Sequence, residues 1–514
     1  MTVESETIAL TLPIPKRKRR RRRAVKISWR FLQVVVVLFA CVAIPSYLTN
    51  PFTRFTTVQD PFITILTADG QLHLIAAAPL QLRTSPWYVL FGKVKAGYHI
   101  AVDALTSTHR TSATNLDSII AEIHHLRFNP DRPYLISGDH FSVLYPRSLS
   151  IFYGSILDPR TALNTEDWLD RERIYLQTTA YALSVYEQAA HLSTTIVPVG
   201  EHSVSLINIY NPPSDTLYSL LFALDSLQHV DTVEKTYPFS SNASYALNTQ
   251  SAAQDLLTQH HRELLYHLHD YLSSVVDPKT GLVKKNILLS SARDGVKRQS
   301  AFYDNVVLWK TQQLAQSLGL VQTDTVTLDN VKQKIIHTYW SEKIGCFLDD
   351  QSAESITQNT YASDWLIVLQ TQFLNPLNAD EAKYYEGCVK YVQQQKLDQP
   401  FGLRYQPTAQ KNQEYWIVKL FASGYGATNI WSHLGAEYMK SLVLLYDETH
   451  DPAYLATARQ QLNAYTQNIL KYKCYPEVYD QNGQMYQTWF YKSVCQTGWV
   501  VSYEQAQKMV AAAE

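Results

Sequence analysis

The stretch from Cys474 to Trp499 combines residue types that can do proton chemistry. It holds two carboxylates, Glu477 and Asp480, among seven aromatic side chains, in a turn-rich segment enclosed by two cysteines. An apolar, partly dry surrounding disfavours the charged form of a carboxyl group and raises its pKa. Such a group can exchange a proton near neutral pH. The stretch therefore offers a candidate general acid or base, although an ordinary surface loop has the same composition.

The elements that must position this loop are helices. From about residue 164 onward apolar residues recur at helical spacing, and several segments begin with caps such as Asp451-Pro452. The predicted helices cover residues 166–191, 214–228, 251–274, 299–319, 325–341, 361–374, 379–396, 429–447, 452–471 and 497–513, with a weaker one at 411–421.

Related short loops recur between these helices, at residues 277–282, 345–350, 400–405 and 475–480. Their spacing of roughly 55–75 residues corresponds to one helical hairpin. A ring of hairpins gathers such loops at one end and builds a single cleft, whereas an irregular helical array scatters them. The repeat favours an (α/α)6 barrel over residues 161–514.

The loop at 475–483, followed by Gln496-Thr-Gly-Trp-Val-Val-Ser-Tyr503, resembles the last hairpin of glucoamylase and glucodextranase-type glycoside hydrolases, in the six-hairpin glycosidase superfamily. By that resemblance Glu477 is the general base. Residues 213–224 resemble a helix start that places Asp215 against the hydroxyls of the terminal sugar. Residues 294–305 resemble the segment with the catalytic acid, eight residues before a Phe, and that position is Asp294.

Three further stretches match the same family in order, within coverage of about residues 205–510. Residues 363–369 resemble an Asp-Ala-Ser-Leu-Leu helix, and Gly402-Leu-Arg-Tyr405 and Gly426-Ala-Thr-Asn-Ile-Trp431 resemble the segments that line the sugar site. The resemblance implies that the substrate contacts include Arg404, Tyr405, Asn429, Trp431 and Trp499. The alternatives are a structural ion pair for the arginine and core positions for the tryptophans.

The departures from the family concern the acid and one cation. Ser214 stands where the family has Arg, and Asp294 stands where it has Glu, with no Trp before it. Asp304 therefore competes for the role of acid, as in trehalase-like barrels, and either Asp could instead cap the helix near 299–319. Inverting hydrolysis requires acid and base carboxyls about 6.5–9.5 Å apart.

The N-terminal part differs in character. Residues 1–30 carry ten Lys or Arg against two acidic residues, and an apolar stretch at 29–48 of nearly bilayer-spanning length follows. We expect a cytoplasmic tail at 1–28, an uncleaved transmembrane signal anchor at 29–48 and an extracytoplasmic remainder, with a cleaved signal peptide as the alternative. A linker at 49–60 and a small mixed α/β subdomain at 61–160, with a hairpin around Asp69-Gly70 and a helix at 115–125, complete the prediction.

The cysteines and the net charge limit which cofactors and partners are expected. Four cysteines lie beyond the anchor, where disulfides persist, and we expect Cys474 to pair with Cys495 because both flank one loop. The absence of a Cys-x-x-Cys pair and of His-Glu-x-x-His disfavours a metal, and the sequence predicts no cofactor. Beyond residue 30 the chain has 35 basic and 44 acidic residues, so nucleic acid is not an expected partner.

The sequence thus predicts a membrane-anchored, extracytoplasmic glycoside hydrolase with a carbohydrate substrate. Two alternatives remain open: a catalytically degenerate barrel that binds a surface glycan, and a polysaccharide lyase or other (α/α) barrel enzyme. The departures at Ser214 and Asp294 favour the first of these two.

Overall fold

The computed structural model describes residues 56–58, 63–68, 71–76, 80–105, 110–129, 133–138, 143–151, 153–200, 203–230, 249–322, 325–408 and 413–514. The predicted tail and transmembrane segment, and part of the predicted linker, lie outside these residues. Within the described ranges, no helix combines the length and the apolar character needed to cross a bilayer.

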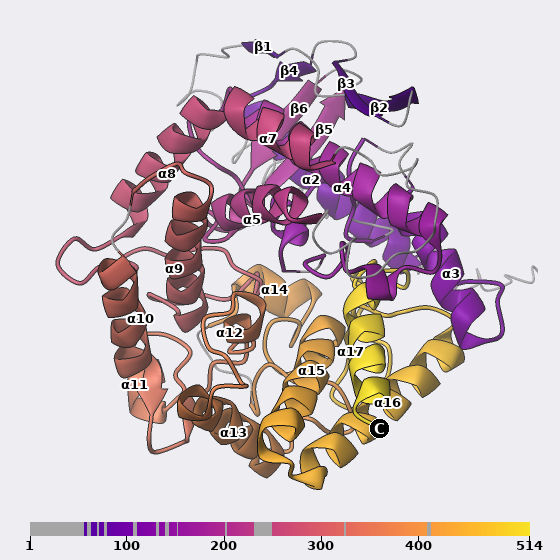
Figure 1. The fold of residues 1–514 in the computed structure, drawn as a ribbon, viewed down its shortest axis with the longest axis vertical. Coiled ribbons are helices and arrows are strands. Elements are labelled where there is room, and N and C mark those ends of the chain that lie inside the picture. The colour runs from indigo at the N-terminus through magenta and orange to yellow at the C-terminus, as the bar shows by residue number, and fades with distance from the viewer. Residues whose placement is uncertain are drawn as a thin grey trace, which may run out of the picture.

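A four-stranded sheet lies at one end of the molecule (Figure 1). Its order is β1 (Thr56–Val58), β4 (Leu80–Leu82), β6 (Ser203–Ile207) and β5 (Thr195–Gly200). β4 and β6 run parallel, and the other neighbours run antiparallel. Because β5 and β6 come from beyond the predicted boundary at residue 160, the N-terminal segment and the helical part share one sheet.

A separate hairpin joins β2 (Ile63–Ala68) to β3 (Gln71–Ala76), with Ala68 opposite Gln71. The hairpin predicted around Asp69-Gly70 is therefore confirmed. Pairs of two-residue strands, isolated bridges and two 3-10 helices connect the remaining elements. They are β7 (Trp340–Ser341), β8 (Cys346–Phe347), β9 (Ile430–Trp431), β10 (Val478–Tyr479), η1 (Pro146–Leu149) and η2 (Pro159–Thr161).

Helices make up most of the described chain. In order they are α2 (Pro86–Leu105), α3 (Leu116–Arg127), α4 (Thr165–Tyr186), α5 (Thr216–Gln228), α7 (Thr249–Gln259), α8 (His261–Val275), α9 (Phe302–Ser317), α10 (Thr325–Tyr339), α11 (Ala353–Gln358), α12 (Ile367–Gln370), α13 (Ala379–Gln394), α14 (Trp416–Phe421), α15 (Ser432–Thr449), α16 (Pro452–Tyr472) and α17 (Val500–Ala512). Several begin at the predicted caps: Asp451 accepts a hydrogen bond from the Ala453 amide at 2.9 Å, with Pro452 at the first helical position.

The helices form two concentric layers around a central axis (Figure 1). Helices α5, α9, α12, α15 and α17 lie inside, and α8, α10, α13 and α16 lie outside them. α10 packs on α9, α13 on α15, and α16 on both α15 and α17. α15 is buried from Ser432 to Val443, as expected for a helix enclosed on every side. This arrangement is consistent with the predicted (α/α)6 barrel.

Several predicted helices differ from the observed ones, and α2 has no counterpart among the predicted ones. The helix predicted over 411–421 begins at Trp416, and the one predicted over 166–191 ends at Tyr186. The segment predicted over 251–274 is divided into α7 and α8 near His260, and the one predicted over 361–374 is reduced to the short α12. The residues before α12 adopt turns because the buried Asp364 side chain forms an ion pair with Arg298 at 2.7 Å.

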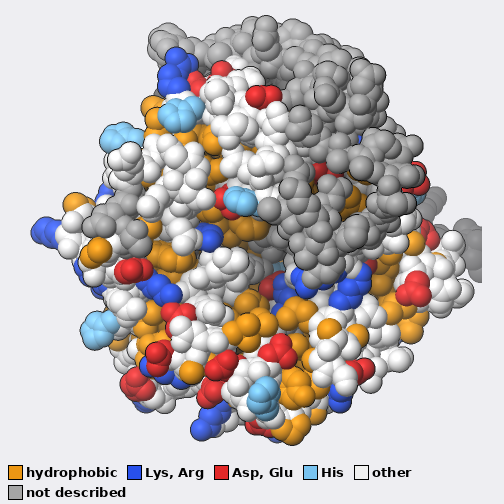
Figure 2. Space-filling view, in the orientation of Figure 1, with side chains coloured by type: hydrophobic (Ala, Val, Ile, Leu, Met, Phe, Trp, Pro, Cys, Tyr) orange, Lys and Arg blue, Asp and Glu red, His pale blue; other side chains and the backbone are white. Residues whose placement is uncertain are grey.

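Acidic and basic side chains are interspersed over the helical half of the face shown in Figure 2.

Candidate active site

Three predicted motifs that are distant in sequence lie side by side. β10, which follows Glu477, pairs antiparallel with β9, so that Val478 lies opposite Trp431. The backbone amide of Ser432 donates to the Glu477 carbonyl at 3.0 Å. Arg404 forms a bridge with Ile430 on the other side of β9. The backbone thus joins the base-bearing loop to both of the segments that resemble the sugar-site lining.

The segments with the other two carboxylates are joined in the same way. Pro213 forms a parallel bridge with Ser290, and the Ser214 amide donates to the Ser290 carbonyl at 2.8 Å. This pairing brings Asp215, at the start of α5, to the loop that carries Asp294. Local backbone pairing at one end of the barrel therefore positions both halves of the site.

Both halves open into one cavity of about 420 Å³. Among the predicted site residues, Asp294, Glu477, Trp431 and Trp499 line it. Residues that the sequence did not indicate also contribute, including Tyr145, Arg147, Tyr210 and Tyr491. Glu477 and both tryptophans are almost fully buried, so their side chains have little room to move. A pocket of this size accommodates one or two sugar rings.

Arg147 is a buried cation beside Asp215, the residue that follows Ser214. It lies on η1, which begins at Pro146, and its guanidinium forms ion pairs with Asp294 at 2.8 Å and with Asp215 at 3.4 Å. Its side chain is 3% exposed, that of Asp215 is fully buried, and that of Asp294 is 27% exposed. One buried cation therefore joins the carboxylate predicted to bind the sugar to the carboxylate predicted to be the acid.

Asp215 is a carboxyl group under opposing influences. Burial raises its pKa to about 6, Arg147 opposes this effect, and the nearby Asp294 charge adds to it. The Tyr303 hydroxyl donates a hydrogen bond to its Oδ2 at 3.1 Å. Asp215 does not line the cavity but lies directly behind the Arg147 guanidinium.

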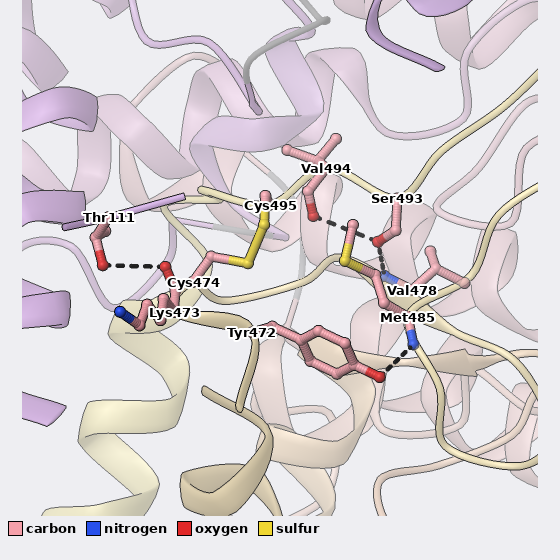
Figure 3. Close-up of a disulfide and its surroundings, with 9 residues drawn as sticks. All are labelled: Thr111, Tyr472, Lys473, Cys474, Val478, Met485, Ser493, Val494 and Cys495. Atoms are coloured by element: carbon pink, nitrogen blue, oxygen red, sulfur yellow. Dashed lines mark hydrogen bonds between the residues drawn. A yellow bond between two sulfur atoms is a disulfide. The ribbon is translucent and has the colours of Figure 1, made fainter. Parts of the chain in front are cut away.

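Glu477 is held rigidly. Its carboxylate accepts a hydrogen bond from the Tyr491 hydroxyl, and its backbone amide donates to the Val494 carbonyl at 3.0 Å. The next amide, that of Val478, donates to Ser493 Oγ at 2.9 Å (Figure 3). The loop is thus fixed on both sides of the candidate base, as positioning a water molecule requires.

The predicted Cys474–Cys495 disulfide closes this loop and is confirmed (Figure 3). The other two cysteines beyond the predicted anchor form a second disulfide, Cys346–Cys388, between β8 and α13.

Aromatic rings form one wall of the cavity. Trp431 and Trp499 are stacked, with ring centroids 6.0 Å apart and an angle of 24° between the planes. Tyr425 meets Trp431 edge to face, at 4.7 Å. Such flat apolar faces beside carboxylates suit the alternating apolar and hydroxyl-bearing surfaces of a sugar ring.

The structure does not bring the remaining predicted residues to the cavity. Asp304 lies in the first turn of α9, is buried, and has a pKa raised to about 7 by burial, against the opposing charge of Arg298. Arg404 directs its guanidinium to the Lys396 carbonyl, at 2.6 Å. Tyr405 stacks against the Arg293 guanidinium at 5.2 Å, and Asn429 is buried beside Gly424. Of these three residues, Tyr405 contacts the aromatic wall, with its ring centroid 5.5 Å from that of Trp431.

Metal ligands do not gather in the described part of the chain, where no group of three or more His, Cys, Asp or Glu side chains could hold an ion.

Comparison with known proteins rests on structure alone, because no family model and no curated sequence matches this chain. The chain is similar to the glucoamylase of Saccharomycopsis fibuligera, with a TM-score of 0.50 and 10% identity over 80% of this chain and 98% of that one. It is also similar to a GH63 mannosylglycerate hydrolase from Thermus thermophilus, with a TM-score of 0.42 and 12% identity over 76% of this chain and 99% of that one. A D-mannose isomerase has a TM-score of 0.42 and 11% identity over 78% of this chain and 99% of that one. The glucoamylase likeness, at 10% identity, concerns the fold alone and is consistent with the (α/α)6 barrel that the sequence predicts.

Proposed function

We propose that this protein is a glycoside hydrolase that acts by inversion, with Glu477 as general base. The observation that carries the proposal is the meeting of Glu477 and Asp294, which are 183 positions apart, in one cavity beside a stacked pair of tryptophans. The glucoamylase fold supports this assignment. Because that likeness concerns the fold alone, the activity rests on the geometry of the site.

In this mechanism Glu477 orients a water molecule and takes its proton, while a carboxylic acid protonates the leaving oxygen on the opposite face of the sugar. Tyr491 holds the Glu477 carboxylate in place. Asp294 is the acid, because Asp304 does not reach the cavity. The Trp431 and Trp499 faces position the ring, and Arg147 binds its hydroxyls.

The ion pair between Arg147 and Asp294 bears on the acid step. A general acid must donate a proton to the leaving oxygen, but the Asp294 carboxylate faces the Arg147 guanidinium. A sugar hydroxyl that accepts a hydrogen bond from Arg147 would free the Asp294 carboxyl to face the leaving oxygen. Without that release the site binds a glycan and does not cleave it, and this is the second candidate function, favoured by the same 2.8 Å contact.

Glu477→Gln tests the proposal. We expect loss of reducing-sugar release from a panel of oligosaccharides and a melting temperature close to that of the parent, because the amide retains the shape of the carboxylate. Asp480→Asn is the matched control in the same loop, since the Asp480 side chain accepts hydrogen bonds from the Asn482 and Gln484 amides and does not line the cavity. Full activity in Glu477→Gln would remove the assignment. Binding without hydrolysis by the parent protein would select the glycan-binding alternative.

The comparison of Asp294→Asn with Asp304→Asn identifies the acid. We expect the first variant to lose hydrolysis and the second to retain it. The opposite result would assign the acid to Asp304 and would require α9 to move toward the cavity.

The location proposed for this activity is the outer side of a membrane. Residues 29–48 would anchor the chain, and the charge excess before them would keep the N-terminus in the cytoplasm. The two disulfides support this placement, because such bonds persist outside the reducing cytosol.

A further inference from the structure

The cavity that holds the carboxylates is lined by two different kinds of residue. The carboxylates, Arg147 and the tryptophans come from η1 and from the loops at the ends of the barrel helices. The remaining lining comes largely from α2, from β6 and the residues after it, from α14, and from the turn at residues 487–492, which is closed by a bridge between Gln487 and Lys492. It is mostly apolar and includes Ala96, Ile100, Ile207, Val418, Phe421 and Phe490, with Lys93 and Tyr210 as polar members. Sugar hydroxyls have no partner among the six apolar side chains.

The elements on the apolar side of the cavity pack directly against their neighbours. A Cβ added at Gly92 on α2 would lie 3.5 Å from Ile207 Cγ2, so α2 packs closely on β6. Phe421 on α14 contacts Phe490, with ring centroids 4.7 Å apart. The cavity thus has a wall suited to an aliphatic chain rather than to a second polar ring.

The same two helices carry exposed apolar side chains on their outer sides. Nine of the fourteen large hydrophobic residues that are exposed in the described part of the chain lie on α2, on α14 or at Trp489. The most exposed among them include Phe91, Val94 and Tyr98 on α2, and Trp416, Leu420 and Trp489 beside α14. Isolated exposed hydrophobic residues are ordinary, but such a concentration on two helices that also line the cavity indicates a contact surface.

Ile417 connects the cavity to this outer surface, because it lines the cavity and is 42% exposed. An apolar ligand that leaves the cavity past Ile417 meets the exposed apolar side chains of α14. On α2, Phe91, Val94 and Tyr98 share one helical face. This face lies opposite the one that carries Ala96 and Ile100, so it is directed away from the cavity.

The length of the N-terminal connection places this surface near the proposed membrane anchor. Residue 48 ends the apolar stretch, and β1 begins at Thr56, which pairs with Leu82, four residues before α2. The seven intervening residues, 49–55, span at most about 25 Å when fully extended. The start of α2 therefore cannot lie far from the point at which residues 29–48 would leave a bilayer. Exposed Trp and Tyr side chains are typical of surfaces at the membrane interface.

We infer that the substrate is a saccharide joined to an apolar chain, as in a membrane glycolipid. This inference rests on the proposed function, since it assigns the sugar to the carboxylate side of the cavity. The apolar chain lies along α14 and α2 and leaves past Ile417 toward the membrane.

Photolabelling of the full chain in phosphatidylcholine nanodiscs tests the position of the apolar chain. The probe is dodecyl glucoside with a diazirine at the end of its alkyl chain, and mass spectrometry maps the labelled peptides. We expect labels in the peptides that contain residues 96–100 and 417–422. Ile417→Ser should lower the yield at both sites several-fold. Ile356→Ser on α11, where the parent side chain is similarly exposed at 46%, should leave the yield unchanged.

Labelling that is spread over all exposed apolar residues, or that is equal in Ile417→Ser and Ile356→Ser, would overturn the inference. The same labelling in Glu477→Gln separates this inference from the proposed function. If the parent protein hydrolyses no glycoside but the labels lie at α2 and α14, the hydrolase assignment fails and the amphiphilic site stands. If the parent protein hydrolyses a short methyl glycoside but the labels lie elsewhere, the hydrolase assignment stands and the amphiphilic site fails.

Discussion

Arg147 forms two ion pairs with one buried guanidinium, one to the fully buried Asp215 and one to the partly exposed Asp294. Removing one partner of a buried ion pair leaves an uncompensated charge and is strongly destabilising. We expect Arg147→Ala to lower the free energy of unfolding by roughly 3–5 kcal/mol in urea titrations. Adding Asp215→Asn should recover part of that loss, because the unpaired charge is then removed.

Arg160 offers the matched control. Its ion pair with Asp158 is short, at 2.6 Å, but Arg160 is 45% exposed. Exposed pairs contribute about 1 kcal/mol or less, so Arg160→Ala should change stability little. Equal effects of the two substitutions would contradict a buried role for Arg147.

Asp304 should make stability depend on pH. Its folded-state pKa is about 7, whereas an unfolded aspartate titrates near 4, so the folded state retains a proton that the unfolded state releases between these values. The free energy of unfolding therefore falls as pH rises from about 4 to 7. Asp304→Asn lacks this dependence. Between about pH 4 and pH 7 its free energy of unfolding should therefore rise relative to that of the parent by up to roughly 4 kcal/mol. Urea unfolding at pH 4.5 and pH 8 measures the difference, and parallel changes in both proteins would contradict it.

Residue types at fixed spacing allowed Glu477 to be predicted, because its proline, aromatic and glycine neighbours are all local in sequence. Arg147 could not be predicted in this way. It lies 68 positions before Asp215, in a segment without helical periodicity, and only the packing of η1 against α5 brings the two together. Arg404 shows the opposite limit: its segment lies beside β9 as the resemblance implies, but the backbone register there directs its side chain to Lys396.

At the scale of elements, the loops could be predicted better than the helices between them. The helical hairpins repeat, so similar loops return to one end of the barrel, and backbone bridges then join them in pairs. The helix predicted over 361–374 failed because a buried ion pair at Asp364 outweighs local helical preference. Periodicity describes which face is apolar and contains no information on such long-range polar contacts.

The Cys474–Cys495 disulfide connects the end of α16 to the segment before α17 across 21 positions. Closing a loop of this length contributes roughly 3 kcal/mol by restricting the unfolded chain. We expect the double substitution of both cysteines by Ser to lower stability by about that amount. It should also lower the hydrolysis rate, because the loop that positions Glu477 is then released.

The second disulfide, Cys346–Cys388, separates these two effects. Replacing both of its cysteines by Ser should lower stability by a similar amount, because it closes a loop of 42 positions. Neither of its residues lines the cavity, so the turnover number at a temperature where the protein is folded should be unchanged. Equal loss of turnover in both double variants would show that the first disulfide acts only through stability.

At the scale of the whole molecule, the sheet and the barrel form one unit around the cavity. α2 belongs to the N-terminal segment, yet Ala96 and Ile100 line a cavity whose carboxylates come from the barrel. The sequence suggested a separate subdomain because hairpin and helical patterns succeed one another there. It could not show that β5 and β6 complete the N-terminal sheet, since strand pairing at this separation depends on the packed helices.

The membrane anchor is the last prediction and the one on which the placement of α2 depends. We expect the full chain to remain in the membrane fraction after a carbonate wash, and a chain that lacks residues 1–48 to be released. Trypsin added to sealed inside-out vesicles should remove the basic residues 16–23 and leave the barrel intact, because positive charges before an apolar segment stay in the cytoplasm. Digestion of the barrel in these vesicles would show that the protein has the opposite orientation in the membrane. Release of the full chain by carbonate would show that residues 29–48 do not anchor the protein. The apolar face of α2 would then have no reason to lie near a bilayer, and a membrane glycolipid would no longer be favoured as the substrate.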